Sequence, residues 1–468
     1  MMLCPARLLL LVLAAAALVA GGLAREAGRV DLASPAVPAA VPPGTRLWTF
    51  SARGFPVEQS PTVSNDGTMV YVGNSDNFTY AVNAADGTQI WSFNLCEGQD
   101  VQGPFCSEFN CCEVQFPPVL SSDGKVLYVG SNGVSSRHLF AVSAAHGDMI
   151  WKFTVGLDVS ECTECNAPAL SKDGSVLYHG DMPLNYDSNV YAVNTSDGTP
   201  LWKSAVCRGK IDFIIASPTL SNDGKTVYVG CFHEELYAIN AADGKLLWTF
   251  ATVAGKGTGI SGASATSSID SKVVYVVSLD YRLYAVNAAD GNQIWNFTTG
   301  SGGLTPATLS TDGKVVYIGS TDMSTYAVNA LTGNQIWTFA TGGYVDFSPK
   351  LSNDGNVVFV CSGIHPKKDS FQLNAINALT GSKIWSLLTS DYHDPGYMDY
   401  LPTVSSDGEA VYVGVGINDF LAVHAANGTV SWNFQTGPKQ LILVPTVSRD
   451  SKVVYVVSYD GTLNAISA

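Results

Sequence analysis

Every tryptophan of this 468-residue chain stands in the same place of one repeated phrase. The phrase is clear at residues 60–93, SPTVSNDGTMVYVGNSDNFTYAVNAADGTQIWSF, and returns at residues 217–250, SPTLSNDGKTVYVGCFHEELYAINAADGKLLWTF. A period of roughly 40 to 50 residues is typical of a repeat architecture. The nine tryptophans are Trp48, Trp91, Trp151, Trp202, Trp248, Trp295, Trp337, Trp385 and Trp432.

One repeat predicts four short strands, which we label A to D. In the first repeat these are residues 60–63, 69–73, 80–83 and 89–93, and the tryptophan lies on strand D. Asn65-Asp66-Gly67 and Asp86-Gly87 supply turns between them. No window after the first residues has a 3.6-residue apolar period, so we expect no helix there.

The order of the strands at the two ends of the chain predicts a closed ring. The chain has a lone strand D at residues 47–50 and a lone A-B-C set at residues 444–466, so each fragment supplies what the other lacks. We therefore expect an all-β fold, a closed β-propeller of four-stranded antiparallel blades whose N-terminal strand completes the last blade. The count gives nine blades, or eight if one unit packs irregularly. Strand A begins near Pro61, Pro118, Pro168, Pro218, Ala265, Pro306, Pro349, Pro402 and Pro445.

The phrase Tyr-Ala-Val-Asn-Ala-Ala-Asp-Gly-x-x-Ile-Trp resembles the repeat of the pyrroloquinoline quinone (PQQ)-like propellers, the quinoprotein alcohol dehydrogenase-like superfamily. Tyr80–Trp91 and Tyr284–Trp295 carry it best, and the resemblance covers nearly all of residues 47–466. It implies that each tryptophan docks against the neighbouring blade. It does not fix the function, because members of this family include both dehydrogenases and scaffolds that bind no quinone.

The first residues have the composition of an export signal. Arg7 precedes an apolar run at residues 8–20, and Gly22-Leu23-Ala24 offers a small-residue cleavage site. The run is too short to span a bilayer well. We expect a signal peptide at 1–24, a flexible Ala/Pro-rich leader at 25–46 and the propeller at 47–468. The protein is then expected to be secreted or held in the secretory lumen, or in the periplasm if the source is bacterial, with no membrane span.

The net charge of −15 has a structural source, because aspartates recur in the A-B and C-D turns, which favour this residue. The acidic balance argues against a nucleic-acid partner. Four Asn-x-Ser/Thr sequons lie on turns or outer strands, where a glycan fits. These glycosylation candidates are Asn77, Asn194, Asn296 and Asn427.

The cysteines gather on one face. In a propeller the B-C turns and the D-to-A crossovers share one face, here called the top face, and the A-B and C-D turns share the bottom face. All nine cysteines after the signal segment map to the top face, together with the longest insertions. Cys231 and Cys361, at the ends of B strands, are the expected free thiols. The crossover cysteines are expected to form disulfides that staple long loops: Cys96, Cys106, Cys111, Cys112, Cys162, Cys165 and Cys207.

The vicinal pair Cys111-Cys112 supports an alternative. The resemblance implies that such a pair, in a crossover between strands D and A, forms a disulfide against the quinone of a quinoprotein alcohol dehydrogenase. The residues after the pair, Glu113-Val114-Gln115, differ from the motif of those enzymes. No metal site is predicted, because Cys162-Thr163-Glu164-Cys165 lacks a second pair of ligands.

The sequence thus supports two functions. The first is a non-catalytic scaffold without cofactor, whose loop-rich, cysteine-rich top face binds a protein or small ligand. The second is a dehydrogenase of alcohols or sugars that depends on PQQ and Ca²⁺, with Cys111 and Cys112 beside the cofactor. No catalytic residue can be named from the sequence for either.

Overall fold

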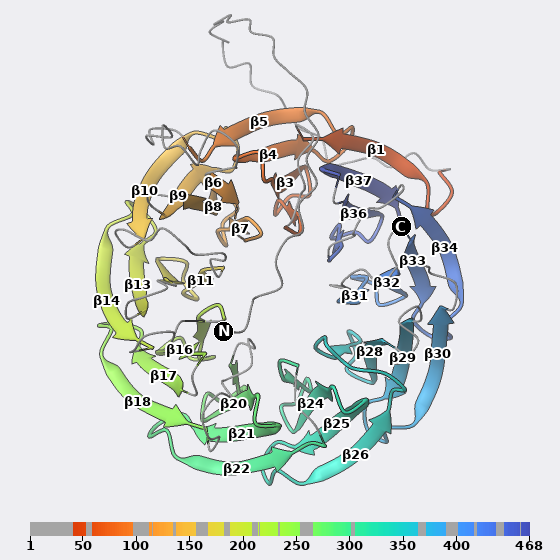
Figure 1. Ribbon diagram of the computed structural model, residues 1–468. Coiled ribbons are helices and arrows are strands. Elements are labelled where there is room, and N and C mark those ends of the chain that lie inside the picture. The colour runs from red at the N-terminus through yellow and green to blue at the C-terminus, as the bar shows by residue number, and fades with distance from the viewer. Residues whose placement is uncertain are drawn as a thin grey trace, which may run out of the picture. The chain divides into compact units, whose positions relative to one another are not determined.

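The fold was determined as a computed structural model, in which the ring lies within the compact unit Ser34–Ala468. It describes residues 41–52, 59–96, 112–114, 116–133, 137–155, 167–181, 188–207, 214, 216–232, 235–252, 265–300, 305–363, 371–389, 401–415, 419–436, 444–458 and 460–468. Over these residues the chain forms nine antiparallel sheets and no helix. Figure 1 shows the sheets in a ring, with the D strands on its outer edge. The expected nine-bladed propeller is confirmed.

Each blade has the strand order A-B-C-D, and we number the blades I to IX by their A strands. The A strands are β2 (Thr62–Val63), β7 (Val119–Leu120), β11 (Ala169–Leu170), β15 (Thr219–Leu220), β19 (Thr266–Ser267), β23 (Thr308–Leu309), β27 (Lys350–Leu351), β31 (Thr403–Val404) and β35 (Thr446–Val447). The B strands are β3 (Met69–Gly73), β8 (Val126–Gly133), β12 (Val176–Gly180), β16 (Thr226–Gly230), β20 (Val273–Ser278), β24 (Val315–Ser320), β28 (Val357–Gly363), β32 (Ala410–Val415) and β36 (Val453–Ser458).

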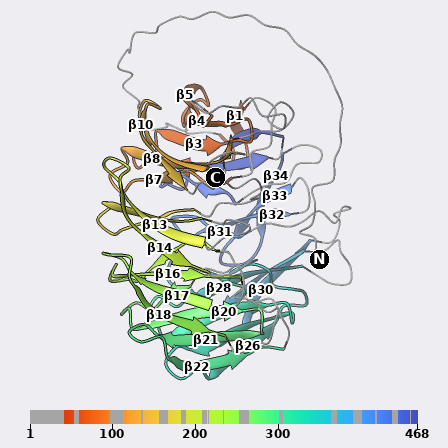
Figure 2. The ribbon, with the colours of Figure 1, turned by 60° about the vertical axis from the view of Figure 1, so that its left-hand side comes forward.

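The C strands are β4 (Phe78–Asn83), β9 (Arg137–Ser143), β13 (Ser188–Asn194), β17 (Glu235–Asn240), β21 (Arg282–Asn287), β25 (Ser324–Asn329), β29 (Phe371–Asn377), β33 (Asp419–His424) and β37 (Thr462–Ser467). The D strands are β5 (Gln89–Asn94), β10 (Met149–Val155), β14 (Pro200–Val206), β18 (Leu246–Ala251), β22 (Gln293–Thr298), β26 (Gln335–Ala340), β30 (Lys383–Thr389), β34 (Val430–Gln435) and, for blade IX, β1 (Arg46–Ser51). Figure 2 shows successive blades from an oblique direction.

The Ser-x-Asp-Gly turn explains why strands A and B end and begin where they do. In blade I the Asp66 carboxylate accepts hydrogen bonds from the Thr68 amide and the Ser64 hydroxyl, at 3.0 and 2.6 Å. The Ser64 hydroxyl in turn accepts from the Met69 amide at 2.9 Å. These bonds satisfy the backbone as it reverses, so the hairpin is encoded locally.

A β-bulge on strand D directs each tryptophan into the joint between two blades. In blade I, Trp91 lies opposite Ala81, but Gln89 already lies opposite Val82, so Ile90 is an extra residue. Trp91 is buried, and its indole Nε1 donates to the Ala144 carbonyl of blade II at 3.1 Å. Eight of the tryptophans are at most 9% exposed, whereas Trp202 is half-buried. The expected docking across blades is thereby confirmed.

The two ends of the ring meet in blade IX, as expected. Strand β1 pairs with β37, with Trp48 opposite Ala465 and Phe50 opposite Leu463. The Gly44 amide donates to the Ser467 carbonyl at 2.8 Å, so contacts with the closing blade already begin within the segment expected to be a leader. On the inner edge, the Thr446 hydroxyl donates to the Pro61 carbonyl of blade I at 2.7 Å.

Candidate partner-binding face

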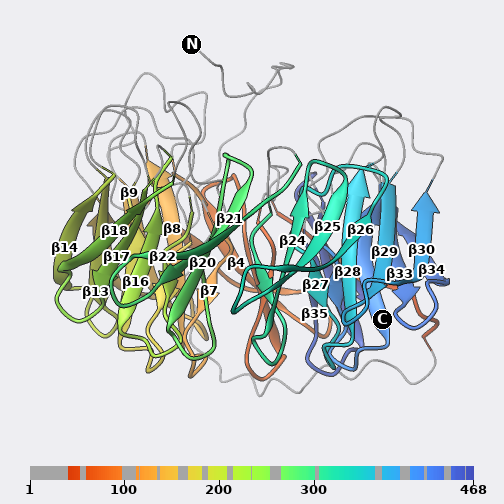
Figure 3. The ribbon, with the colours of Figure 1, turned by 90° about the horizontal axis from the view of Figure 1, so that it is seen from below.

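The top face consists of the B-C turns and the D-to-A crossovers, which lie at one end of the blades seen side-on in Figure 3. The described parts of three crossovers share a packing contact that we did not predict from the sequence. In each, the residue five places before the first residue of strand A packs against a glycine at or next to the end of strand B in the preceding blade. These residues are Val114, Ile214 and Val345, which cover Gly73, Gly180 and Gly319.

The backbone of the same crossovers pairs with the following blade. Strand β6 (Cys112–Val114) pairs with β8 of blade II, and Ile214 forms a bridge with Cys231 of blade IV. One crossover therefore holds two blades, by its side chain on one and its backbone on the next. The sequence signal was available, since each of these crossovers carries an apolar residue four places before Pro118, Pro218 or Pro349.

A group of titratable side chains lies at the top of blades II and III. Arg137, His138 and His179 are strand residues with 3%, 6% and 3% of their surface exposed. Burial, with the nearby charge of Lys152, lowers the pKa of His138 to about 4. Burial, with the charge of Arg137, lowers the pKa of His179 to about 4 as well. Both imidazoles are therefore neutral at physiological pH.

His179 and Asp181, which follows it by two residues, differ in whether their polar atoms have hydrogen-bond partners. The Asp181 carboxylate, 5% exposed, accepts hydrogen bonds from the Asn189 side chain at 2.9 Å and the Tyr191 hydroxyl at 3.0 Å. Burial raises the pKa of Asp181, although these hydrogen bonds oppose the effect. His179 Nδ1 has no hydrogen-bond partner among the described residues, and its ring lies 6.2 Å from the Phe116 ring.

One cysteine of the top face that we expected to be free forms a disulfide. Cys207, directly after β14, forms a disulfide with Cys231, directly after β16, with a Cα–Cα distance of 5.5 Å. The expectation that Cys231 is free is wrong, because the end of strand B in blade IV faces the crossover that leads into that blade. Cys361 is a buried free thiol, as expected. Cys96 is also disulfide-bonded.

The other expected disulfide or cofactor cysteines lie outside what the structure describes. Cys106, Cys111, Cys162 and Cys165 are outside the described residues, and only the backbone of Cys112 is described. Among the described residues, no group of three or more His, Cys, Asp or Glu side chains is placed to hold a metal ion.

The four sequons fall into two pairs. Asn296 on β22 and Asn427 in the C-D turn of blade VIII are exposed. Asn77 and Asn194 are half-buried, and Asn77 has a φ of 73° beside the fully buried Thr79. The first pair therefore presents the more exposed asparagine side chains.

The repeat phrase, the tryptophan joints and the ring together define a PQQ-like β-propeller. The family model described as outer membrane protein assembly factor BamB matches residues 36–210, 113–282, 186–362 and 369–468. These matches cover most of the chain, which therefore belongs to this family. A comparison with curated protein sequences gave no match.

Solved structures with the same fold include proteins of different activity. BamB from Moraxella catarrhalis is 18% identical, with a TM-score of 0.50 over 71% of this chain and 91% of that one. The quinohemoprotein alcohol dehydrogenase ADHIIG from Pseudomonas putida HK5 is 14% identical, with a TM-score of 0.57 over 90% and 76%. The C-terminal WD40 domain of Sif2 is 10% identical, with a TM-score of 0.57 over 92% and 99%. At these identities the likeness establishes the fold and leaves the activity open. No helix among the described residues is long and apolar enough to cross a membrane.

Proposed function

We propose that the protein is an exported, non-catalytic scaffold that binds a protein partner on its top face. One observation carries the proposal. Four side chains at this face that could act in acid-base or thiol chemistry, His138, His179, Asp181 and Cys361, are each at most 6% exposed and are held within the blades. Such groups stabilise a rigid support and do not meet a substrate. Membership of the family described as an assembly factor supports the same function.

The packing of the crossovers also supports a binding role for this face. Because the crossovers that carry Val114, Ile214 and Val345 are each fixed to two blades, they present their outer surfaces in a defined geometry, which lowers the entropic cost of binding a partner. The top face also carries exposed aromatic side chains, with Phe232 38% and Tyr281 46% exposed. Aromatic residues of this kind are common anchors in protein interfaces.

Site-specific photo-crosslinking tests the proposal. A benzoylphenylalanine at position 232 or 281 of the full-length chain is expected to give a discrete adduct in cells of the source organism. The matched control positions are Leu331 and Leu379 on the bottom face, 83% and 81% exposed, which are expected to give none. Equal adducts from both faces, or adducts from the bottom face alone, would show that the top face is not the binding surface.

The alternative function is a dehydrogenase that depends on PQQ and Ca²⁺. The likeness to the alcohol dehydrogenase fold favours this candidate, with Cys111 and Cys112 beside the cofactor. We expect the purified protein, mixed with PQQ and Ca²⁺, to reduce no dye in the presence of alcohols or sugars. Dye reduction that disappears in the variants Cys111→Ser and Cys112→Ser would show that the protein is a dehydrogenase and would contradict the scaffold function.

Export has its own test. The proposed cleavage after Ala24 gives a mature chain that begins at Arg25, which N-terminal sequencing of the protein from its source reads directly. If the protein retains residues 1–24 and stays inside the cell, the proposed export is wrong. The proposed binding at the top face does not depend on this result.

A further inference from the structure

The A-B turns of the bottom face stack on one another around the ring. At most of these joints the second residue of the turn approaches the fourth residue of the turn in the next blade. A Cβ on Gly124 would lie 2.8 Å from the Asn65 side chain, and one on Gly355 would lie 2.8 Å from the Thr311 hydroxyl. These short distances show that the second residue fills the joint between adjacent turns.

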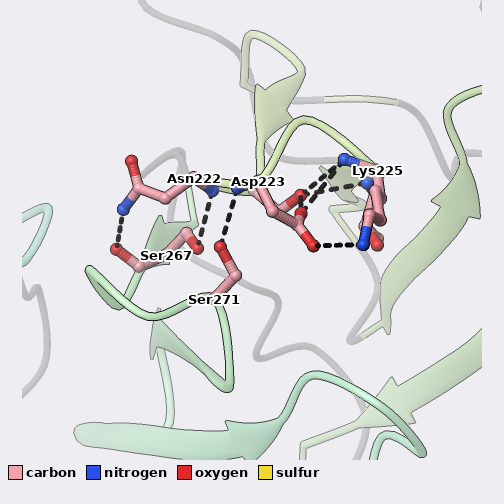
Figure 4. A network of polar contacts seen from close by, with 7 residues as sticks. Asn222, Asp223, Lys225, Ser267 and Ser271 are labelled. Carbon is pink, nitrogen blue, oxygen red and sulfur yellow. Dashed lines mark hydrogen bonds and ion pairs between the residues drawn. The ribbon is translucent and has the colours of Figure 1, made fainter.

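An asparagine at the second position closes the joint by hydrogen bonds. Figure 4 shows this between blades IV and V, where Asn222 reaches Ser267 and the Asp223 amide meets Ser271. The Asn222 side-chain amide also donates to the Ser268 carbonyl at 2.8 Å. Asn353 closes the joint between blades VII and VIII in the same way, with bonds of 3.0 Å to the Ser405 and Ser406 carbonyls.

The joint between blades III and IV is an exception, because its second residue is Lys172. A Cβ on Gly224 would meet only the Lys172 Cγ, at 4.0 Å. Arg449 stands at the equivalent position before blade I, but its guanidinium reaches the Asn65 side chain at 3.2 Å. Lys172 has no such bond to the described part of blade IV, and the joint opens into a groove of about 570 Å³. We call it the Lys172 groove.

The charged side chains that line the Lys172 groove have no net charge. Lys172 and Lys225 face it together with Asp173 and Asp223. Lys225 lies 3.7 Å from Asp223, whereas Lys172 forms no ion pair with the described carboxylates. The Asp173 Oδ1 atom accepts bonds from Ser171 and Ser175, so this carboxylate is fixed in place. Leu201, which is 51% exposed, adds apolar surface, whereas Tyr178 is buried with 3% of its surface exposed.

We propose that the Lys172 groove binds a neutral saccharide of one or two rings. Each hydroxyl of a sugar both donates and accepts hydrogen bonds, so it pairs equally well with the Lys172 ammonium and with the fixed Asp173 carboxylate. The apolar C–H face of the ring packs on Leu201. An anion in the groove would meet Asp173 and Asp223, and a cation would meet the two lysines. The volume lies within the range of small-molecule sites, roughly 300–1,000 Å³.

Isothermal titration of the full-length protein tests the proposal, with maltose, cellobiose, lactose and diacetylchitobiose as probes. We expect at least one disaccharide to bind, with an affinity that changes little with salt because no net charge is neutralised. The variant Lys172→Asn is expected to close the joint as Asn222 and Asn353 close theirs, and to weaken binding by about tenfold or more. Asp173→Asn should weaken the same binding.

Two controls keep the outcome interpretable. Asn353→Lys makes the reverse exchange at the joint between blades VII and VIII, and it should leave disaccharide binding at the Lys172 groove unchanged. Lys172→Ala tests the ammonium without adding a new bridge. Binding of inorganic phosphate in place of the sugars would overturn the neutral ligand class. Absence of binding to all four sugars, or binding that survives Lys172→Asn, would overturn the site.

Discussion

The glycine Gly44 lies against the indole of Trp432, and a Cβ on Gly44 would be 2.8 Å from the Trp432 Cβ and Cγ atoms. Gly44 has a φ of 77°, and its amide donates to the Ser467 carbonyl. In blade I, Gly87 has a φ of 75°, donates to the Asn83 carbonyl and lies against Trp48. The segment before β1 therefore supplies the C-D turn glycine of blade IX, although it is far from β37 in the sequence.

This relationship predicts the effect of Gly44→Ala. The substitution strains a left-handed backbone and forces the new methyl group into Trp432, so we expect a loss of about 2–4 kcal/mol in unfolding free energy. Gly67→Ala is the matched control, because Gly67 has a φ of 75° but no atom within 4 Å of the added Cβ. Urea unfolding should show a smaller loss for Gly67→Ala. Equal losses would mean that the contact with Trp432 contributes nothing.

The tryptophan joints should differ in strength. Trp248 is 8% exposed and donates to the Ala288 carbonyl of blade V at 2.9 Å. We expect Trp248→Ala to cost about 3–5 kcal/mol, the usual range for removal of a large buried aromatic side chain. Trp202 is half-buried, so Trp202→Ala should cost less. Thermal unfolding followed by circular dichroism measures both, and a larger effect at Trp202 would contradict this order.

The disulfide between Cys207 and Cys231 reinforces the joint between blades III and IV. At the neighbouring joint, Phe250 packs on Tyr284 with ring centroids 5.3 Å apart, whereas Ser204 occupies the corresponding place in blade III. Replacing both cysteines by alanine should cost about 2–4 kcal/mol. Ser204→Phe, added to the double alanine variant, should restore roughly 0.5–1.5 kcal/mol of unfolding free energy because the new ring packs on Tyr237. The melting temperatures of the variants measure both effects. An unchanged melting temperature for the double alanine variant would refute the stabilising role of the disulfide.

The buried histidines predict a pH dependence of stability. The pKa of His179 is about 4 in the folded state, against a reference value of 6.5, because burial penalises the charged form. The unfolded chain therefore binds more protons between these values, and the stability present above pH 6.5 is lost as the pH falls toward 4. For His179 this loss is on the order of 3 kcal/mol. In the variant His179→Leu, the midpoint of urea unfolding should change less with pH over this window. A pH dependence equal to that of the unsubstituted protein would argue against a contribution from His179.

Local sequence patterns accounted for most of the fold. The Ser-x-Asp-Gly turns, the strand lengths and the position of Trp91 in its phrase act within a few residues, so they can be recognised without coordinates. The missing strands at the two ends predicted the pairing of β1 with β37, because a closed ring leaves one arrangement for complementary fragments. The resemblance of Tyr80–Trp91 to the PQQ-like repeat identified the family.

The sequence by itself thus determined the propeller of four-stranded blades and its closing strand, and it left a ring of nine or eight blades. Only the tertiary structure decided which atoms meet across the joints. Cys231 pairs with Cys207, Val114 covers Gly73, and Lys172 leaves a groove that Asn222 closes elsewhere. Each of these depends on the distance between side chains of neighbouring blades. That distance is set by how the sheets pack, and no local pattern of residues encodes it.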